Sequence, residues 1–430
     1  MNSARRPIVV MKFGGTSVGD VSRVKHVADI IMAHRRERPD AGIVVVLSAM
    51  AGETNKLVSL AKSCVDEPSG REMDVLLSSG EQVTVALLAM RLSALGVPAK
   101  SLLGAQAKIS TSDRHTNALI EDVETDSIEA VLSHGGVPVI AGFQGVTERG
   151  DITTLGRGGS DITAVAVAAA LRAEACFIYT DVRGVYSADP RVCGGARILE
   201  RVAHEEMLEM ASLGAKVLHT RSVFFAMRYA VPLVVLSTFA GAFVPGINGT
   251  WIVSEEELME KPVVTGVTHR VDEARLTIQS MPGDISTMAR LFSVLGERDI
   301  LVDMISQETV SPGLVNVSLT VADEQSSAAL DVARSVVPEL GAGGASVERN
   351  IAKVSVVGLG MRSHTDVAGR TFRALQRHGI DLQMVNTSEI KISVLVARKH
   401  CEAAVRALND EFAPEVSLTF GAAGLELAGA

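Results

Sequence analysis

The first residues that could do chemistry stand near the start of the chain. Lys12, Gly14 and Gly15 follow an apolar run over 8–11 and precede a helical pattern that begins at Val21. Glycine lets a backbone turn tightly and lets a ligand approach it closely. Backbone N–H groups at a helix start attract anions, and Lys12 adds a full positive charge. The segment predicts a phosphate-binding turn, although an ordinary strand-to-helix turn would carry the same residues.

A second glycine-rich turn, LGRGGSDITA, lies at residues 155–164. Arg157 stands in it, and arginine can hold a carboxylate through two parallel hydrogen bonds. An apolar helix expected over 161–172 begins at the end of this turn, with either Ser160 or Asp161 as its N-cap. The helix start offers further N–H donors to an anion. The two turns together predict two negative ligands held close to each other.

Three more segments carry candidate polar groups. YTDVRGVYSADPR comes at the end of an apolar strand and forms a turn that contains glycine and proline. Sheets of α/β proteins bind ligands beyond such strand ends. LGAKVLH presents Lys216 beside a glycine, and SSGEQ opens a predicted helix that presents Glu81. A glutamate there is as consistent with a solvated helix face as with a ligand contact. The candidates in the first segment are Thr180, Asp181, Tyr186, Asp189, Pro190 and Arg191.

A regular scaffold is predicted for the residues up to about 255. Apolar strand-like runs alternate with helical patterns, which favours a mainly parallel sheet with helices on both faces. The clearest strands are 8–11, 43–47, 137–141, 176–179 and 233–236, and the clearest helices are 21–35, 78–95, 161–172 and 205–213.

Beyond a charged linker over 254–262, the chain repeats itself. FSVLGERDILVDMISQ begins at Phe292, and FRALQRHGIDLQMVNT begins 80 residues later at Phe372. Each copy includes a helix and is followed by a strand, over 315–321 and 391–397. The agreement goes beyond the periodicity of a hydrophobic core, so the pattern predicts a duplicated βαββ module.

Composition narrows the classes of function. The chain has 430 residues, a net charge of −9 and 47% hydrophobic residues, which indicates a soluble globular protein of two or three domains. The acidic balance counts against nucleic acid or an anionic membrane as the main partner. The four cysteines lack metal-ligand spacing and no secretory segment stands out, so we expect reduced thiols in a cytoplasm. No apolar stretch is expected to approach the roughly 20 residues of a membrane span.

The chain resembles the aspartate kinases, which have the amino-acid kinase fold, in a series of ordered segments. These are KFGGTSV, LSAM, SSGE, AGFQG, TLGRGGSD, YTDV followed by GVYSADPR, and LGAKVLH. The C-terminal repeat resembles the two ACT domains that these enzymes carry. The resemblance covers the chain from about residue 7 to 425.

The resemblance implies a fold in three parts. We expect a three-layer αβα amino-acid kinase domain with a mainly parallel sheet over 1–255, followed by two βαββαβ (ferredoxin-like) ACT domains. The first ACT domain is placed at 264–340 and the second at 350–410. A last strand within 413–425, EVSLTF, is expected to complete the first ACT domain, with the second one inserted.

The resemblance also implies a reaction. ATP with Mg²⁺ phosphorylates the β-carboxylate of L-aspartate to 4-phospho-L-aspartate, the first step toward lysine, threonine and methionine. A carboxylate is ionised at pH 7, so no general base is needed. The main obstacle is repulsion between that carboxylate and the triphosphate, and positioning and positive charge overcome it.

Site roles follow by the same resemblance. The residues expected at the transferring phosphates are Lys12, Lys216 and Asp161, the last of them orienting the lysines or the metal. The residues expected at the substrate are Arg157 with Ser160 on the α-carboxylate, Glu81 on the α-ammonium and Thr54 alongside. The nucleotide is expected against Lys12, Phe13, Gly14, Gly15, Thr180, Asp181, Tyr186, Asp189, Pro190, Arg191 and Lys216. No resident metal site is expected.

Four positions depart from the family's usual pattern. They are Ile162, Arg183, Thr220 and Asp366. The first three flank the expected site and spare its charged groups. They leave the reaction class intact, while nucleotide affinity and substrate stringency stay open.

Regulation and assembly are implied by the ACT resemblance. ACT domains bind amino acids between paired modules, and in this family the effector is lysine, threonine or both. The candidate contacts are Met281, Asp284, Asp303, Ile305, Gln307, Asn386 and Thr387, although ordinary turn chemistry would explain these polar residues equally well. We expect a homo-oligomer formed through the ACT domains, and Met259 is a candidate internal start for a shorter ACT-only chain.

Two other classes of function stay open. One is an amino-acid kinase that acts on glutamate or an N-acylated amino acid, against which Glu81 and the paired ACT domains speak. The other is a catalytically inactive amino-acid sensor. The charged candidates of the site are all present, and a sensor would not need to keep them.

Overall fold

The central sheet has eight strands, and β1 (Ile8–Phe13) lies between β2 (Gly42–Leu47) and β9 (Ala175–Thr180). The computed structural model describes residues 6–241, 248–258 and 262–418. The other strands of this sheet are β3 (Ala99–Leu102), β6 (Val137–Ala141), β10 (Arg201–Ala203), β11 (Leu233–Ser237) and β12 (Gly249–Val253). The order is β10-β12-β11-β9-β1-β2-β6-β3, and only β11 and β12 pair antiparallel.

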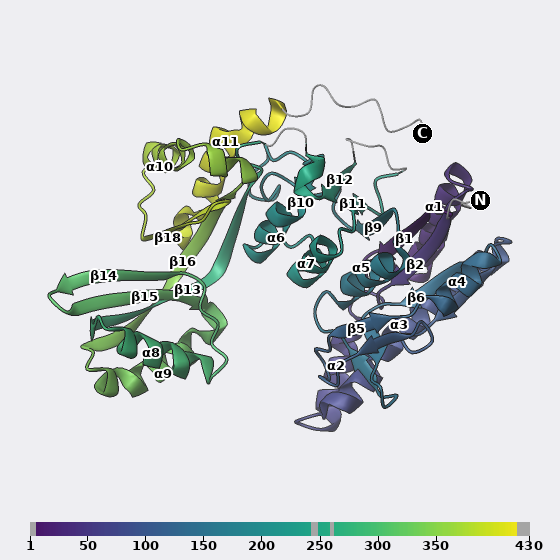
Figure 1. Cartoon of the computed structure of the whole chain (residues 1–430), viewed down its shortest axis with the longest axis horizontal. Coiled ribbons are helices and arrows are strands. Elements are labelled where there is room, and N and C mark those ends of the chain that lie inside the picture. Colours follow the sequence, from purple (N-terminus) through teal and green to yellow (C-terminus); the bar gives the residue numbers. More distant parts are fainter. Residues whose placement is uncertain (1–5, 242–247, 259–261, 419–430) are drawn as a thin grey trace.

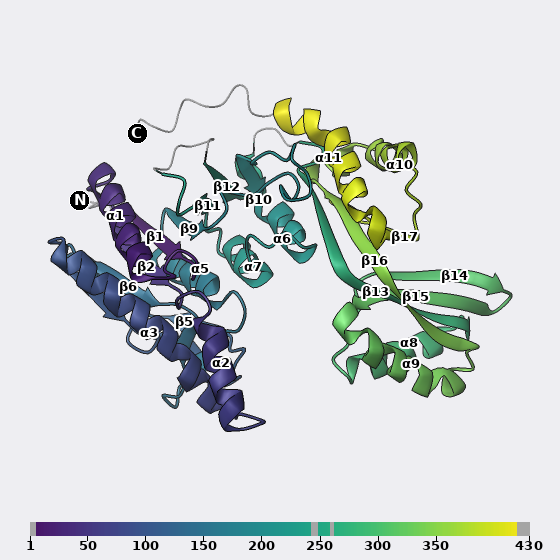
Figure 2. The same cartoon turned by 180° about the vertical axis from the view of Figure 1, so that it is seen from behind.

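Helices cover both faces of this sheet (Figures 1 and 2). One face packs against α1 (Val21–Glu37) and α3 (Gly70–Ala94), with α2 (Glu53–Cys64) beside α3. The other face packs against α4 (Asp126–Ser133), α5 (Gly159–Leu171), α6 (His204–Ser212) and α7 (Thr220–Arg228). The predicted three-layer arrangement with a mainly parallel sheet is confirmed.

The side chains of β1 alternate between these two faces. Val9 and Met11 pack with the α1 and α3 layer, whereas Val10 packs with the layer that contains α5. Because the side-chain period of a strand is two, Lys12 points to the same face as Val10. The lysine therefore faces α5 at the carboxyl end of the central strand.

A small second sheet lies beside α3. Its order is β5-β4-β7-β8, with β4 at Ile109–Thr111, β5 at Ile120–Val123, β7 at Gln144–Val146 and β8 at Ile152–Thr154. Strand β8 packs directly against α3 and is followed by the second glycine-rich turn. This sheet therefore carries that turn toward the carboxyl ends of the central strands.

The C-terminal half, from β13 onward, is built on one continuous six-stranded sheet, in the order β14-β15-β13-β16-β18-β17. Its strands are β13 (Gly266–Pro282), β14 (Ile305–Ser311), β15 (Leu314–Ala322), β16 (Gly344–Val357), β17 (Met384–Thr387) and β18 (Lys391–Ala397). Its helices are α8 (Ile285–Gly296) and α9 (Ser326–Leu340) in the first module, and α10 (Val367–Arg377) and α11 (Cys401–Leu418) in the second. The predicted duplication is confirmed by this repeated order of elements.

The two modules share their longest strands. The half of β13 that pairs with β15 and the first half of β16 belongs to the first module, while residues 266–270 pair with 353–357 in the second. The first module thus obtains all four strands from within 273–351. The strand expected within 413–425 is absent from residues 413–418, which belong to α11, and β13 and β16 pair with each other in the first module. Residues 419–425 lie outside the described residues.

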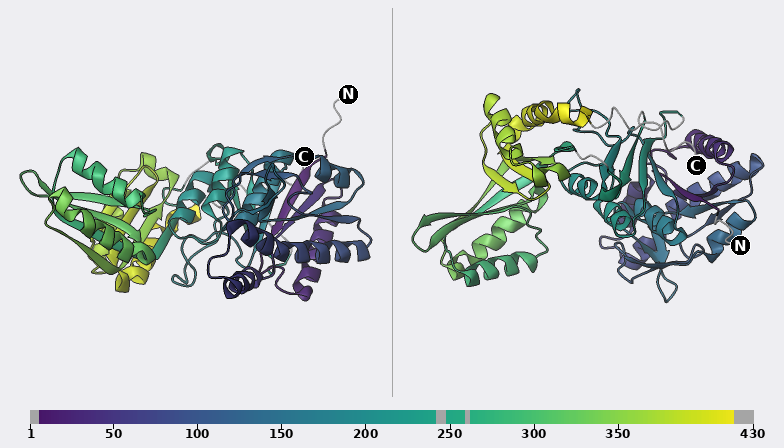
Figure 3. Two further views of the ribbon diagram at one scale, coloured as in Figure 1. Left: turned by 90° about the horizontal axis from the view of Figure 1, so that it is seen from below. Right: turned by 45° about the horizontal axis from the view of Figure 1, so that its top comes forward.

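Helix α6 joins the N-terminal half to the C-terminal half, and the views of Figure 3 show the two halves side by side. Glu206 is buried at this junction, where its Oε1 accepts hydrogen bonds from Thr265 Oγ1 (2.6 Å) and Leu359 N (2.9 Å). Glu209 on the same helix lies 2.9 Å from Lys391 Nζ. The loop after α6 carries Lys216, so the helix links the C-terminal sheet to a predicted phosphate-binding residue.

The predicted strands of the central sheet and the predicted helices are present, with one boundary wrong. Helix α3 begins at Gly70 and not at Ser78. The pair Ser78–Ser79 resembles a helix start, but their hydroxyls donate to the carbonyls of Val75 and Leu76 in the preceding turn of the same helix. Glu81 therefore lies in the middle of α3.

Helix α3 also corrects the membrane expectation. With 25 residues it is long and apolar enough to cross a membrane by length and composition, but half of its apolar window is buried inside the protein. A core helix passes the same test, and α3 packs against the central sheet. The feature is weak evidence for a span. The charged linker holds a short 3-10 helix, η1 (Glu255–Glu257), and Met259 lies outside the described residues.

Candidate active site

A cavity of about 310 Å³ lies at the carboxyl ends of β1, β2 and β6, between α3 and the start of α5. This is the edge at which a parallel α/β sheet binds ligands. The cavity is lined by the predicted residues Lys12, Gly15, Thr54, Glu81, Arg157, Ser160 and Asp161. Segments far apart in the sequence therefore meet at one site.

Lys12 and Asp161 form the most charged part of this cavity. Lys12 Nζ lies 2.5 Å from Asp161 Oδ1, and the side chains are only 11% and 13% exposed. Asp161 stands in the first turn of α5, on the face of the sheet toward which Lys12 points. The carboxylate thus holds the ammonium group in a fixed place where an anion can reach it.

Glu81 offers a negative group from the opposite wall. The residue is 3% exposed, and its Oε1 accepts a hydrogen bond from Ala49 N at 2.9 Å. Helix α3 comes this close because Gly80 has no side chain: a Cβ there would lie 2.8 Å from Ala49 Cβ. Glu81 Oε2 is buried and has no hydrogen-bond partner among the described residues. Burial raises the pKa of Glu81 to about 7.

Arg157 is exposed at the mouth of the cavity and has no ion pair or hydrogen bond within the described residues. Its turn ends at Gly158, whose φ of +71° is a conformation that favours glycine. Gly158 is the N-cap of α5, so the expected cap by Ser160 or Asp161 is wrong. A Cβ at Gly158 would lie 2.4 Å from His219 Cβ, which shows how closely the LGAKVLH segment packs on this turn.

The unsatisfied polar groups of the cavity match the charged groups of an amino acid. Glu81 Oε2 is an acceptor without a donor, and Arg157 is a bidentate donor without an acceptor. An α-ammonium and an α-carboxylate would satisfy them. The cavity contains a further positive group, Lys12, beyond what an α-amino acid needs.

The predicted nucleotide residues lie mainly outside the cavity lining. Gly14 N donates to Tyr179 O at 3.3 Å, which joins the end of β1 to the end of β9, where Thr180 and Asp181 follow. Phe13 is fully buried and stacks on Tyr179 at 4.4 Å between ring centroids. Only the backbone of Phe13 is therefore left to face a ligand.

The turn Asp189–Arg191 packs toward the C-terminal half. Arg191 Nη2 donates to Asp189 Oδ2 at 2.7 Å, and this hydrogen bond holds the pKa of Asp189 below its usual value. The neighbouring Ala188 and Cys193 are buried in the core of the second module. Pro190 is exposed, and Tyr186 is half-buried.

Lys216 is not brought into the cavity. It is exposed in the loop after α6, and this loop packs closely on the C-terminal sheet. A Cβ at Gly214 would lie 2.4 Å from His269 O in β13.

The expected effector residues are partly engaged within the chain. Met281 is fully buried in the first module's core, and Asp284 caps α8 by accepting from Thr287 N at 3.0 Å. Lys353 Nζ forms ion pairs with Asp303 and with Glu273 Oε1, the latter at 2.9 Å. Ile305, Gln307 and Thr387 are exposed, and Asn386 is half-exposed.

The departures from the family's pattern leave the charged groups untouched. Ile162 is buried against Ala118 and Leu155, away from the cavity. Thr220 is the first residue of α7, a position that also accepts proline, and Arg183 is exposed. Asp366 occupies the N-cap position of α10.

Some site residues were not predicted. Phe143 and the backbone from Ser48 to Gly52 also line the cavity. Phe143 has a φ of +69°, and its place between Gly142 and Gln144 gave no clear signal. The carboxylate of Asp74 is fully buried on α3, two turns before Glu81, and this helical spacing was a usable signal.

The chain matches the amino acid kinase family over residues 7–237 and the ACT domain over 354–412. An aspartate kinase of Stutzerimonas stutzeri (strain A1501) is 49% identical over 405 residues, which cover 94% of this chain and 97% of that protein. The solved structure of E. coli aspartokinase III in complex with aspartate and ADP (R-state) has a TM-score of 0.74 at 27% identity, covering 94% of this chain and 99% of that one. The same enzyme in complex with lysine and aspartate (T-state) has a TM-score of 0.72 at 26% identity, with the same coverage.

Proposed function

Because this chain belongs to the aspartate kinases of the amino acid kinase family, we propose that its cavity binds L-aspartate by the α-ammonium and α-carboxylate and presents the β-carboxylate to ATP. The observation that carries this proposal is the pair of unsatisfied groups, Glu81 Oε2 and the Arg157 guanidinium, in one cavity. Ser160 adds a donor beside Arg157, and Thr54 lies along the wall. The E. coli structure, which holds aspartate and ADP, supports this assignment.

The proposed reaction joins a β-carboxylate oxygen to the γ-phosphorus of ATP and breaks the bond from that phosphorus to the β,γ-bridging oxygen. ADP leaves with that bond's electron pair, and no proton has to move because the carboxylate is already ionised. Lys12, held by Asp161, offsets the charge that gathers on the phosphoryl oxygens. The N–H group of Gly15 and the residues Thr180 and Asp181 border the nucleotide, whereas the N–H of Gly14 is engaged by Tyr179 O.

Lys216 and the carboxylates that could hold Mg²⁺ need separate arguments. Lys216 lies on the loop after α6, and we assign it to the phosphates by the family pattern and because this loop packs beside the glycine-rich turn at Gly158. Mg²⁺ is commonly held by one or two carboxylates together with substrate phosphates. Asp161, and Asp181 at the end of β9, fit that donor set, and a bound Mg²⁺ would neutralise phosphate charge.

The ACT modules make this a regulated kinase. We assign the effector as lysine, threonine or both, since the E. coli relative is solved with lysine. The Asp303 side chain is 45% exposed and already binds an ammonium, that of Lys353. An amino-acid effector would bring the same group to the same carboxylate.

We assign assembly to the first module. Ile285, Leu301 and Ile305 are exposed apolar residues there, and β14 is an edge strand, so a second copy has both apolar area and unpaired backbone to use. A shorter chain starting at Met259 stays a proposal, and a band at the mass of residues 259–430 that disappears in Met259→Leu would support it. We propose that the enzyme works in the cytoplasm, where it would carry out a biosynthetic reaction as its relatives do.

The test of the function is ADP release from MgATP with L-aspartate, L-glutamate and N-acetylglutamate in parallel. We expect turnover with aspartate that is lost in Lys12→Ala and Arg157→Ala. Turnover only with one of the other acceptors would assign a different amino-acid kinase. Folded protein that shows no turnover with any acceptor, but is thermally stabilised by an amino acid, would be a sensor.

A further inference from the structure

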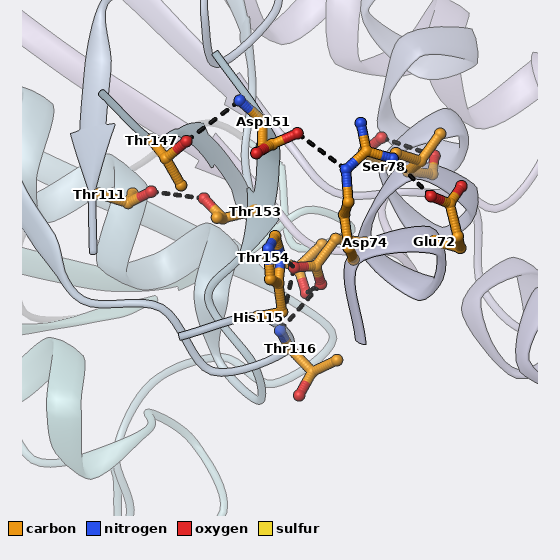
Figure 4. A network of polar contacts seen from close by, with 12 residues as sticks. Glu72, Asp74, Ser78, Thr111, His115, Thr116, Thr147, Asp151, Thr153 and Thr154 are labelled. Carbon is orange, nitrogen blue, oxygen red and sulfur yellow. Dashed lines mark hydrogen bonds and ion pairs between the residues drawn. The ribbon is translucent and has the colours of Figure 1, made fainter. Parts of the chain in front are cut away.

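Asp74 is a fully buried carboxylate that the reaction itself does not use. It stands on α3 seven residues before Glu81, so the two side chains lie on the same face of that helix, two turns apart. Figure 4 shows Asp74 pointing away from the helix toward His115, Thr116 and Thr154. A buried charge is costly unless it is fully hydrogen-bonded, and this one is.

The hydrogen bonds of Asp74 all go to the small sheet and its loop. Thr154 Oγ1 donates to Asp74 Oδ1 at 2.5 Å, and His115 Nδ1 lies 2.7 Å from Oδ2. Thr116 N lies 3.0 Å from each carboxylate oxygen. Thr154 is the last residue of β8, and Arg157 follows three residues later.

The loop that Asp74 holds also touches the turn that carries Arg157. Thr116 has a φ of +67°, which is strained for a β-branched residue, and its N–H is one of the groups bound to Asp74. Beyond it, a Cβ at Gly156 would lie 3.2 Å from Thr116 O and 3.0 Å from Asn117 Oδ1. The backbone just before Arg157 therefore rests on a loop whose conformation Asp74 stabilises.

We propose that Asp74 is a positioning residue that sets the spacing between Glu81 and Arg157 and thereby fits the site to the α-ammonium and α-carboxylate of its acceptor. Helix α3 carries the group for the α-ammonium, and β8 leads to the group for the α-carboxylate. Asp74 joins these two elements through buried hydrogen bonds. The inference rests on the proposed function, since it takes those two residues as the substrate's receptors.

A second contact joins α3 to the start of β8 at the surface, and it provides a matched control. Arg71 on α3 donates from Nε to Asp151 Oδ1 at 2.8 Å, immediately before β8, and both side chains are substantially exposed. Exposed ion pairs contribute little. Arg71→Gln should therefore leave the kinetics unchanged if the buried contact, and not mere proximity of the two elements, sets the spacing.

The experiment compares Asp74→Asn, Thr154→Val and Arg71→Gln with the wild-type chain in steady-state kinetics. We expect KM for aspartate to rise about tenfold in Asp74→Asn and severalfold in Thr154→Val, with KM for ATP and kcat within about twofold. The preference for aspartate over glutamate, as a ratio of kcat/KM, should stay within about twofold, because both acceptors carry the same α-groups. Arg71→Gln should match the wild type.

Several outcomes would overturn the inference. KM for aspartate and ATP rising together, or an equal effect in Arg71→Gln, would mean that Asp74 only stabilises the fold. If Asp74→Asn shows no cooperative unfolding transition, Thr154→Val decides, and an unchanged KM for aspartate in that variant refutes the proposal. Wild-type protein without turnover on any acceptor would instead contradict the proposed function itself.

Discussion

Lys12 Nζ and Asp161 Oδ1 lie 2.5 Å apart in a cavity between the central strand and the start of α5. The pair brings a positive charge to the place where a phosphoryl group would transfer, and it does so with little solvent around it. Low exposure strengthens such an interaction relative to water. The two side chains should therefore act as one unit in catalysis.

Lys12→Met should lower kcat by about 10²–10³-fold, because preorganised charge stabilises the transition state more than the bound substrates. Asp161→Asn should also lower kcat, by releasing the ammonium from its position. Steady-state kinetics of both variants and of the double variant measure this. We expect the double variant to be about as impaired as Lys12→Met alone. Fully additive losses would show that the two residues act independently.

Glu81 should make aspartate binding depend on pH. Burial raises its pKa to about 7, and only the ionised carboxylate can hold the α-ammonium. KM for aspartate should therefore fall by up to about tenfold between pH 6 and pH 8, following the ionised fraction of this group. KM for ATP is the control, since Glu81 is not among the residues that we assign to the nucleotide. A flat pH profile of KM for aspartate would contradict this role.

The same pKa gives a prediction for stability. Between its ordinary value of 4.5 and about 7, Glu81 binds its proton more tightly in the folded protein than in the unfolded chain. The free energy of unfolding therefore falls as pH rises through this window. Glu81→Gln removes the titration. The free energy of unfolding of the variant, relative to that of the wild type, should therefore rise from pH 5 to pH 8, by roughly 3 kcal/mol at most. Urea unfolding at both pH values measures it, and a difference that does not change with pH would refute it.

Glu206 should couple the regulatory sheet to the kinase half. It is buried at the junction and accepts from Ala203 N in the kinase half as well as from Thr265 and Leu359 on the regulatory side. Glu206→Gln leaves a buried donor facing Ala203 N, which should cost about 2–4 kcal/mol and weaken inhibition by the effector. Thermal unfolding and inhibition curves measure both. The control is Glu209→Gln, a partly exposed position on the same helix, and equal effects in both variants would contradict a special role for Glu206.

Asp303 tests the regulatory assignment. Its carboxylate binds the ammonium of Lys353 and is still 45% exposed. Asp303→Ala should raise the lysine or threonine concentration needed for half-inhibition by about tenfold or more while kcat without effector stays within about twofold. Activity titrations with each amino acid measure this. Unchanged inhibition would move the effector site elsewhere in the modules.

The central strands and the ligand-binding edge could be predicted because they rest on local signals. Apolar runs such as 137–141 are long enough to identify a buried strand, and glycines mark the turns that follow. The start of α3 was misplaced because Ser78, Ser79 and Gly80 resemble a cap in sequence. Gly80 instead lets the helix approach Ala49, and only the tertiary structure contains that contact.

The sharing of β13 and β16 between the two modules was not predictable from the repeat. An offset of 80 residues identifies two copies, but it does not show which strand pairs across them. Strand β13 lies in the first copy and its long partner β16 leads into the second. Pairing between such distant strands depends on the assembled sheet. Met281 illustrates the same limit, since its side chain faces the core of the first module.

The most direct test of the central claim is the identity of the phosphorylated carboxylate. Folded wild-type protein is incubated with MgATP, L-aspartate and hydroxylamine, and the trapped hydroxamate is identified by mass spectrometry against α- and β-aspartyl standards. We predict β-aspartyl hydroxamate, formed in step with ADP and absent in Arg157→Ala. Formation of the α-hydroxamate, or ADP release without any hydroxamate, would contradict the orientation in which Glu81 and Arg157 hold the α-groups.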